Sequence, residues 1–182
     1  MIRTIHRAKF VLAEADLLLQ DAAVHVCDPG RICRVEPWST AESGPDVDVI
    51  DWGPAVLMPG LVNTHAHLAR HLARGLDLRT AADWEHYDRT LSPEDVHWAA
   101  AAALVEGVRH GVTTLCDFHR SSGCLELSLS EVVGAALRVG VRVATCYGAA
   151  GHDPPRERRA ALEESLGLAA DLARRREGRL RG

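Results

Sequence analysis

The sequence predicts an α/β protein, with a parallel β-sheet covered by helices and a small all-β module ahead of it. From residue 56 onward, short apolar segments typical of buried strands alternate with amphipathic helical segments. Before that point, strand-like segments are separated by Asp-Pro-Gly and by breaks rich in Ser, Gly and Pro. The 182 residues are 47% hydrophobic, which is enough for a sizeable core.

The all-β module covers residues 1–56. Its strand-like segments are rich in β-branched and other apolar residues, and a long polar loop interrupts them near residue 40. The expected strands lie at 7–12, 21–27, 31–37 and 47–53.

The parallel part begins with an apolar strand at 55–65 that Pro59-Gly60 interrupts. A helix then starts at Ser92, a natural N-cap that is followed by Pro93 and, three residues after the cap, by an aspartate. Gly111 is placed to end this helix in a left-handed turn.

The alternation continues to the end of the sequence. The remaining expected elements are a strand at 112–118, a helix at 127–139 closed by a glycine, a strand at 141–147, a helix from 153 to 178 and the start of a strand after it. Parallel strands need helices on their outer face, so the pattern predicts either a doubly wound sheet or part of an eight-stranded barrel.

Charge and cysteine content argue against several classes of protein. The net charge of −4 does not favour binding to nucleic acid or to an acidic membrane. Five cysteines without a CxxC motif fit reduced thiols better than a disulfide framework. No secretory signal and no long uncharged apolar run occur, so we expect a soluble cytoplasmic protein. Phosphate-binding GxGxxG and GxxxxGK[ST] motifs are absent, as is the HxE…PCxxC signature of cytidine-type deaminases.

Two histidines mark the end of the first predicted parallel strand. Alternate strand residues face the same side, so His65 and His67 can hold one metal ion together. Active sites of α/β folds lie at this end of the strands. Imidazole suits Zn²⁺, Fe²⁺ and related ions, and a bound metal lowers the pKa of its water to about 7. The alternative is that both are ordinary surface or core histidines.

The stretch "MPGLVNTHAHLARHLARGL" at 58–76 resembles the first-strand signature of the amidohydrolase superfamily. Within that superfamily it is similar to the deaminase/chlorohydrolase branch, which includes cytosine deaminases, triazine hydrolases and SsnA-like aminohydrolases. "GVTTLCDFH" at 111–119 resembles the second strand of that family. The resemblance covers the whole chain and implies a partial TIM (β/α)8 barrel of about three βα units over 57–182. An N-terminal β-sandwich half over 1–56 would precede it.

The resemblance also implies a chemistry. His65 and His67 would be ligands of one divalent metal, with zinc expected and iron(II) or another ion as alternatives. The metal-activated water would attack a C–N or C–Cl bond of a small nitrogen heterocycle, in a deaminase-like reaction. Segment 57–182 is about half of the roughly 250 residues typical of a full barrel, so we expect truncation near strand 4. The other ligands and the acid/base would lie beyond Gly182, leaving this chain inactive by itself; a non-catalytic or metal-binding remnant is the alternative.

Four further residues are candidates either for supporting the metal ligands or for contacting the substrate. Asp117 and His119 alternate at the end of the second strand, and we expect both to face the same mouth as the histidine pair. Arg74 could hold a loop or an anionic group, or form a structural ion pair. Trp84 could stack on a planar heterocycle or serve packing alone. Assembly into a homo-oligomer is left open.

Overall fold

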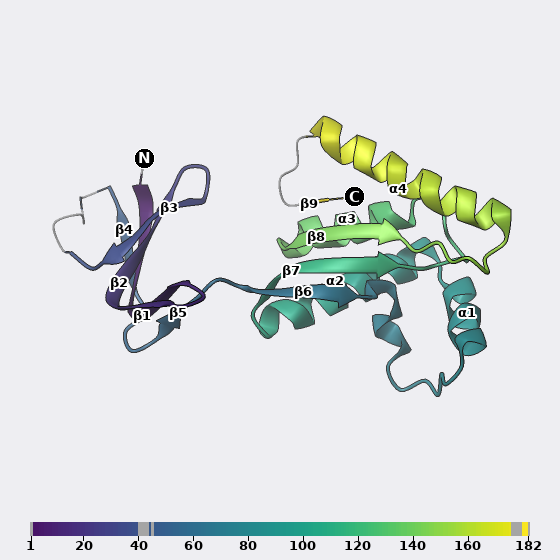
Figure 1. Ribbon diagram of the computed structural model, residues 1–182, viewed down its shortest axis with the longest axis horizontal. Helices are drawn as coiled ribbons and strands as arrows, with labels where there is room; N and C mark the ends of the chain where they lie inside the picture. Colours follow the sequence, from purple (N-terminus) through teal and green to yellow (C-terminus); the bar gives the residue numbers. More distant parts are fainter. Residues whose placement is uncertain (1, 40–43, 45, 176–179, 182) are drawn as a thin grey trace. The chain divides into compact units, whose positions relative to one another are not determined.

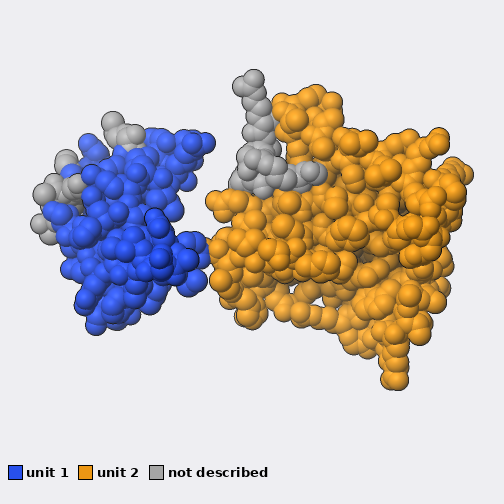
Figure 2. Space-filling view, viewed as in Figure 1, with its two compact units in different colours: residues 1–59 blue, residues 60–182 orange. Residues whose placement is uncertain are grey.

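The computed structural model describes residues 2–39, 44, 46–175 and 180–181, and its chain divides into two compact units, 1–59 and 60–182 (Figures 1 and 2). Among the described helices, none combines the length and apolar composition that a membrane-spanning segment needs.

The first unit is a five-stranded sheet with the order β3-β2-β1-β4, and β5 pairs with β1. Its strands are β1 (Ile2–Glu14), β2 (Leu17–Cys27), β3 (Arg31–Pro37), β4 (Asp48–Asp51) and β5 (Val56–Leu57). β1, β2 and β3 pair antiparallel, whereas β4 and β5 run parallel to β1. A small core of Ala8, Val11 and Ala22 lies in this sheet.

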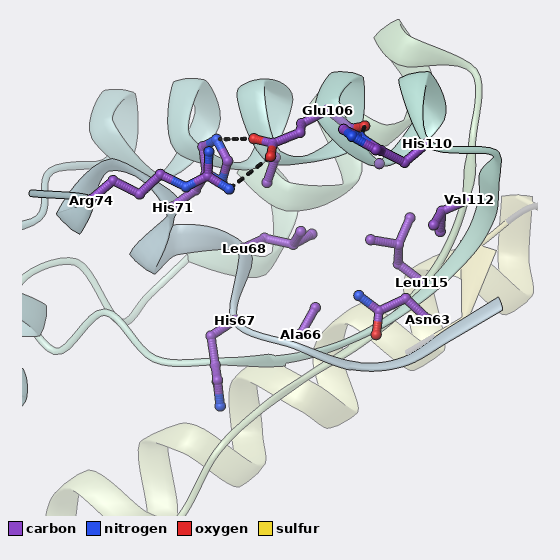
Figure 3. Close-up of a pocket in the computed structure, with 12 residues that line it drawn as sticks. Asn63, Ala66, His67, Leu68, His71, Arg74, Glu106, His110, Val112 and Leu115 are labelled. Carbon is purple, nitrogen blue, oxygen red and sulfur yellow. Dashed lines mark hydrogen bonds and ion pairs between the residues drawn. The ribbon is translucent and has the colours of Figure 1, made fainter. Parts of the chain in front are cut away.

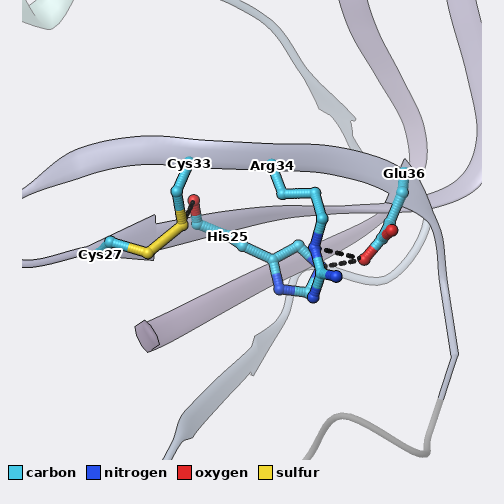
Figure 4. The surroundings of a disulfide bond; sticks show 5 residues. All are labelled: His25, Cys27, Cys33, Arg34 and Glu36. Atoms are coloured by element: carbon cyan, nitrogen blue, oxygen red, sulfur yellow. Dashed lines mark hydrogen bonds and ion pairs between the residues drawn. A yellow bond between two sulfur atoms is a disulfide. The ribbon is translucent and has the colours of Figure 1, made fainter. Parts of the chain in front are cut away.

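The expectation of reduced thiols throughout is wrong for one pair of cysteines. Cys27 and Cys33 form a disulfide that spans the β2–β3 turn (Figure 4). The antiparallel pairing brings the ends of β2 and β3 together, and the Cα atoms lie 5.9 Å apart, within the range that a disulfide spans. Spacing in the sequence alone did not reveal this pairing. The three other cysteines are free.

The second unit is a parallel four-stranded sheet with the order β6-β7-β8-β9 and with helices packed against it (Figure 1). Its strands are β6 (Leu61–Ala66), β7 (Val112–His119), β8 (Arg142–Tyr147) and β9 (Leu180–Arg181). Its helices are the 3-10 helix η2 (Leu68–Ala73), α1 (Ala81–Thr90), α2 (Pro93–Arg109), α3 (Ser128–Val139) and α4 (Pro155–Arg175). From α2 to β9, helices and strands alternate in the predicted order.

Local signals in the sequence place the helix ends. Ser92 and Asp95 form a capping box at the start of α2, and Gly111 follows that helix with a φ of 82°. Gly140 ends α3 with a φ of 84°. A second capping box, Thr80 with Asp83, starts α1, a helix that the sequence analysis did not predict.

The single strand expected at 55–65 is in fact two strands that belong to different units. β5 pairs with β1 of the first unit, whereas β6 pairs with β7 of the second. Between them, Gly60 passes so close to Thr113 that a Cβ atom on it would lie 2.1 Å from the threonine Oγ1. Only glycine fits this approach without displacing Thr113, which explains the Pro-Gly interruption.

The core of the second unit lies between the sheet and its helices. Fully buried side chains from α2 and α3 include Val96, Leu104, Leu129 and Val132. They pack with Leu115 of β7 and Val143 of β8. The opposite face of the sheet carries the more exposed side chains, including Phe118, which is 43% exposed.

Candidate metal centre

His65 and His67 lie together at the carboxyl end of β6. Their Nε2 atoms are 3.1 Å apart, and the two rings meet edge to face with centroids 4.8 Å apart. In a tetrahedral zinc site with Zn–N bonds of about 2.1 Å, two ligand nitrogens lie roughly 3.4 Å apart. The spacing of this pair therefore fits two ligands of one ion.

Hydrogen bonding fixes which nitrogen of His67 is available. Its Nδ1 lies 2.7 Å from the carbonyl oxygen of Phe118. A carbonyl can only accept, so Nδ1 carries the proton and donates it, and Nε2 keeps a lone pair. Metal-binding histidines usually make this second contact, which sets both the tautomer and the orientation of the ring. The backbone N–H of His65 donates to the side chain of Asn63 at 3.1 Å.

A hollow of about 250 Å³ adjoins His65 on the face of the sheet that the helices leave uncovered. Thr64, Cys116, Phe118 and Cys146 are among the residues that line it. Burial raises the pKa of the Cys146 thiol, so this sulfur is a protonated thiol at neutral pH when no metal is bound. Around the histidine pair, the described residues include no third His, Cys, Asp or Glu that would complete a group of three.

Asp117 and His119 do not face the mouth where we expected them. They are 4% and 0% exposed and lie in the buried layer between the sheet and the helices. The register explains this, because Ala66 pairs with Asp117 and neighbouring strand residues in register share a side. His65 and His67, which flank Ala66, therefore project to the other side.

Both buried groups have strongly shifted pKa values. Burial raises the pKa of Asp117 to about 6, although hydrogen bonds from the Leu68 N–H and the Thr145 hydroxyl favour its ionised form. Burial lowers the pKa of His119 to about 3, with a smaller contribution from the Arg70 guanidinium. Its Nε2 lies 2.7 Å from the hydroxyl of Ser121, while its Nδ1 has no hydrogen-bond partner in the described structure.

Arg74 lies on the helix side of the sheet edge, where it forms an ion pair with Glu106 at 2.8 Å. His71 contacts the same carboxylate at 3.4 Å, and the three side chains line a hollow of about 290 Å³ (Figure 3). In that view the ring of His67 points away from Glu106. The structure thus gives Arg74 the ion-pair contact that we weighed as the alternative to a substrate contact.

Trp84 lies on α1 with one ring face against the Arg70 guanidinium, 4.9 Å from the ring centroid. Its ring also meets Tyr87 edge to face at 6.2 Å. Arg70 in turn donates two hydrogen bonds, of 3.0 and 2.6 Å, to the buried carboxylate of Asp88. The face of Trp84 that Arg70 covers is unavailable for stacking on a substrate.

Sequence reasoning missed three groups at this end of the sheet: the Phe118 carbonyl that contacts His67, the Thr145 hydroxyl that contacts Asp117, and the Arg70–Asp88 pair. Each contact joins residues that are 18 or more positions apart in the chain. Only the strand register, combined with the positions of the helices, could have indicated them.

Comparison with known proteins agrees with this arrangement. Residues 56–178 match the model of the amidohydrolase family, which is more than half of the chain. The chain belongs to the amidohydrolase family. Among curated relatives, the 5-methylthioadenosine/S-adenosylhomocysteine deaminase of Moorella thermoacetica is 32% identical over 158 residues, which are 82% of this chain and 35% of that protein. The 5'-deoxyadenosine deaminase of Methanosarcina barkeri is 31% identical over 74% of this chain and 33% of its own length. This amidohydrolase chain thus spans about a third of the length of the curated relatives it matches.

Solved structures confirm the predicted fold. An atrazine chlorohydrolase from Arthrobacter aurescens, complexed with zinc, matches with a TM-score of 0.74 and 22% identity over 98% of this chain and 45% of its own. The E. coli guanine deaminase matches with a TM-score of 0.69 and 19% identity over 99% of this chain and 44% of its own. The second unit is therefore part of an amidohydrolase (β/α)8 barrel, as the family resemblance implied, whereas the alternation of strands and helices alone had left a doubly wound sheet open.

Proposed function

We propose that this chain carries the first two metal ligands of a hydrolase that acts on a C–N or C–Cl bond of a small nitrogen heterocycle, with a deaminase-like reaction. His65 and His67 are the ligands, and zinc is the ion that they hold. The observation that carries the proposal is the 3.1 Å separation of two Nε2 atoms, one of which belongs to a ring whose Nδ1 proton is committed to the Phe118 carbonyl.

The names of the relatives support the choice of substrate. The Moorella and Methanosarcina relatives are named deaminases of adenosine derivatives, and the Arthrobacter neighbour is a chlorohydrolase of a triazine. In all of these substrates, the carbon under attack belongs to a nitrogen-containing ring that carries an amine or a chloride. A small heterocycle of this kind is the substrate class that we propose for the whole enzyme.

The roles of this chain's residues follow from their contacts. When bound, a divalent ion supplies a water molecule that is ionised near neutral pH. His65 and His67 bind that ion as neutral imidazoles, and the Phe118 carbonyl holds the His67 proton at Nδ1. Phe118 also adds an apolar side chain to the hollow beside His65. Catalytic zinc sites have three protein ligands, so the two in this chain should bind zinc without supporting turnover by themselves.

The roles of the two domains belong to the same proposal. Residues 1–56 are proposed to form half of a β-sandwich and residues 57–182 to form the first part of the hydrolase barrel. Assembly into a homo-oligomer remains a prediction that no observation tests.

Replacing His65 or His67 by alanine is expected to abolish zinc binding, because one remaining imidazole cannot hold the ion with comparable affinity. Zinc content after equilibrium dialysis and titration with a chromophoric zinc chelator measure the effect. His86→Ala is the matched control, since this histidine lies exposed on α1 and has no contact with the pair. Equal zinc binding by the wild type, His65→Ala and His86→Ala would refute the ligand assignment.

A further inference from the structure

We propose that Asp117 and Thr145 are positioning residues for His67: together they hold the backbone turn that carries this imidazole, and the zinc affinity of the histidine pair depends on them. The inference rests on the proposed function, because it gives the His67 ring a metal to bind. It concerns two buried side chains on β7 and β8 that do not face the metal themselves.

Asp117 caps the helix that begins directly after His67. His67 is the N-cap residue of η2, and its own side chain makes no capping hydrogen bond. The first N–H groups of a helix have no partner within the helix and need one from elsewhere. The Asp117 carboxylate, from the neighbouring strand, accepts the N–H of Leu68 at 2.8 Å. The Leu68 N–H at this turn is therefore satisfied from β7, in addition to the local hydrogen bond from the Arg70 N–H to the His67 carbonyl at 3.0 Å.

Thr145 holds the Asp117 carboxylate in place. Its hydroxyl donates to the second carboxylate oxygen at 2.9 Å, and the two residues are register partners on β7 and β8. Thr145 is 3% exposed, so water does not compete for this bond. The contacts run sideways across three strands, from Thr145 through Asp117 to the end of β6.

The next residue of β7 controls the His67 ring. The carbonyl of Phe118 accepts the Nδ1 proton at 2.7 Å, while the side chain of Asp117 holds the backbone one residue beyond His67. Two consecutive residues of β7 thus hold His67: the Phe118 carbonyl binds its ring, and the Asp117 carboxylate binds the backbone that follows it. Losing the carboxylate frees the turn, and the ring can then leave the Phe118 carbonyl and exchange tautomers. A hydrogen bond to the ring of a metal ligand, such as the one from His67 to the Phe118 carbonyl, typically contributes about 10–100-fold to metal affinity.

Four variants of the full chain test the inference through zinc affinity, measured by competition with a chromophoric chelator. Asp117→Ala is expected to weaken zinc binding by about tenfold or more. Asp117→Asn keeps an oxygen that accepts the Leu68 N–H, so its affinity should stay close to that of the wild type. Thr145→Val should give an intermediate loss. Ser165→Ala is the control, because it removes a hydroxyl bonded to the β8 backbone at 2.9 Å but has no contact with His67.

A second readout does not need zinc. Nitrogen-15 NMR of the imidazole rings reports the tautomer of His67, which should be Nδ1–H in the wild type, in Asp117→Asn and in Ser165→Ala. Asp117→Ala and Thr145→Val should show a mixture of tautomers. This separates the two proposals: if the wild-type chain binds no zinc but Asp117→Ala shows the mixture of tautomers, the metal assignment is refuted and the positioning role is supported.

The inference is overturned if Asp117→Ala binds zinc as tightly as Ser165→Ala and retains a single His67 tautomer. If Asp117→Ala does not fold, Thr145→Val decides, since it leaves the carboxylate in place and removes one hydrogen bond. Wild-type affinity together with an unchanged tautomer in Thr145→Val would then overturn the role of the pair.

Discussion

Replacing Asp88 by alanine is expected to lower the free energy of unfolding of the second unit by about 3–5 kcal/mol, the typical cost of removing one partner of a buried ion pair. Asp88 is 1% exposed and accepts two hydrogen bonds from Arg70. Its removal leaves the Arg70 guanidinium, whose side chain is 22% exposed, without its carboxylate. All described helices lie in this unit, so denaturant unfolding followed by the helical circular dichroism signal measures its stability.

The effect should extend to the metal centre because of where the partners lie. Arg70 lies three residues after His67, on η2, whereas Asp88 lies on α1. Arg120, just after β7, approaches the same carboxylate at 3.9 Å and makes two hydrogen bonds to Asp153. Asp88 therefore joins the connection after β6 to the connection after β7, and Arg120 extends this link to Asp153 in the connection after β8.

An exposed ion pair on the same helix provides the control for Asp88→Ala. Glu85 contacts Arg89 at 3.4 Å, and their side chains are 39% and 63% exposed. Glu85→Ala should cost less than about 1 kcal/mol, because water solvates both charges after the pair is broken. A loss in Asp88→Ala no larger than that in Glu85→Ala would show that the buried pair does not support the unit.

Local chemistry made the strand and helix order of the second unit predictable from the sequence. Ser92 with Asp95 starts a helix whatever the tertiary structure, and a glycine at 111 or 140 ends one, because left-handed backbone is costly for other residues. The position of the histidine pair was predictable for a similar reason. It follows an apolar strand directly, so it had to lie at that strand's end.

The side to which each strand-end residue points was not predictable. A buried parallel strand is apolar on both faces, so "VTTLCDF" gives no sign of which alternate set faces the helices. The pairing of Ala66 with Asp117 decides it, and a bulge in β6 shifts the register between Asn63 and Ala66. The Cys27–Cys33 pairing likewise depends on the β2–β3 register, and the division of 55–65 into two strands depends on the pairing of β5 with β1 and of β6 with β7.

Acid should destabilise the wild-type chain through His119 by about 3 kcal/mol between pH 7 and pH 4, relative to a His119→Gln variant. Burial lowers the pKa of folded His119 from 6.5 to about 3, so the folded state keeps this ring neutral. The unfolded chain binds a proton as the pH falls below 6.5, and the folded chain does not. The contribution of His119 is therefore fully present above pH 6.5 and is lost progressively as the pH falls towards 3. Glutamine can keep the hydrogen bond to Ser121 but does not titrate.

The pH dependence of stability that Asp117 contributes has the opposite sign to that of His119. Burial raises its folded pKa from 3.8 to about 6, so its contribution is present below pH 3.8 and is lost as the pH rises towards 6. His119 Nδ1 lies 3.8 Å from an Asp117 oxygen, but the two are not an ion pair, because the ring is neutral wherever the carboxylate is ionised. Between pH 4 and pH 6, the rise in stability with pH that His119 contributes offsets the fall that Asp117 contributes.

Replacing either residue should leave the other residue's effect on the pH dependence of the unfolding free energy measurable by itself. Denaturant unfolding of Asp117→Asn should show stability rising with pH by about 1.4 kcal/mol per unit more than the wild type does, over pH 4 to 6. His119→Gln should differ from the wild type by about the same slope with the opposite sign. An unchanged pH dependence in Asp117→Asn would show that Asp117 does not titrate over this range, and an unchanged pH dependence in His119→Gln would show the same for His119.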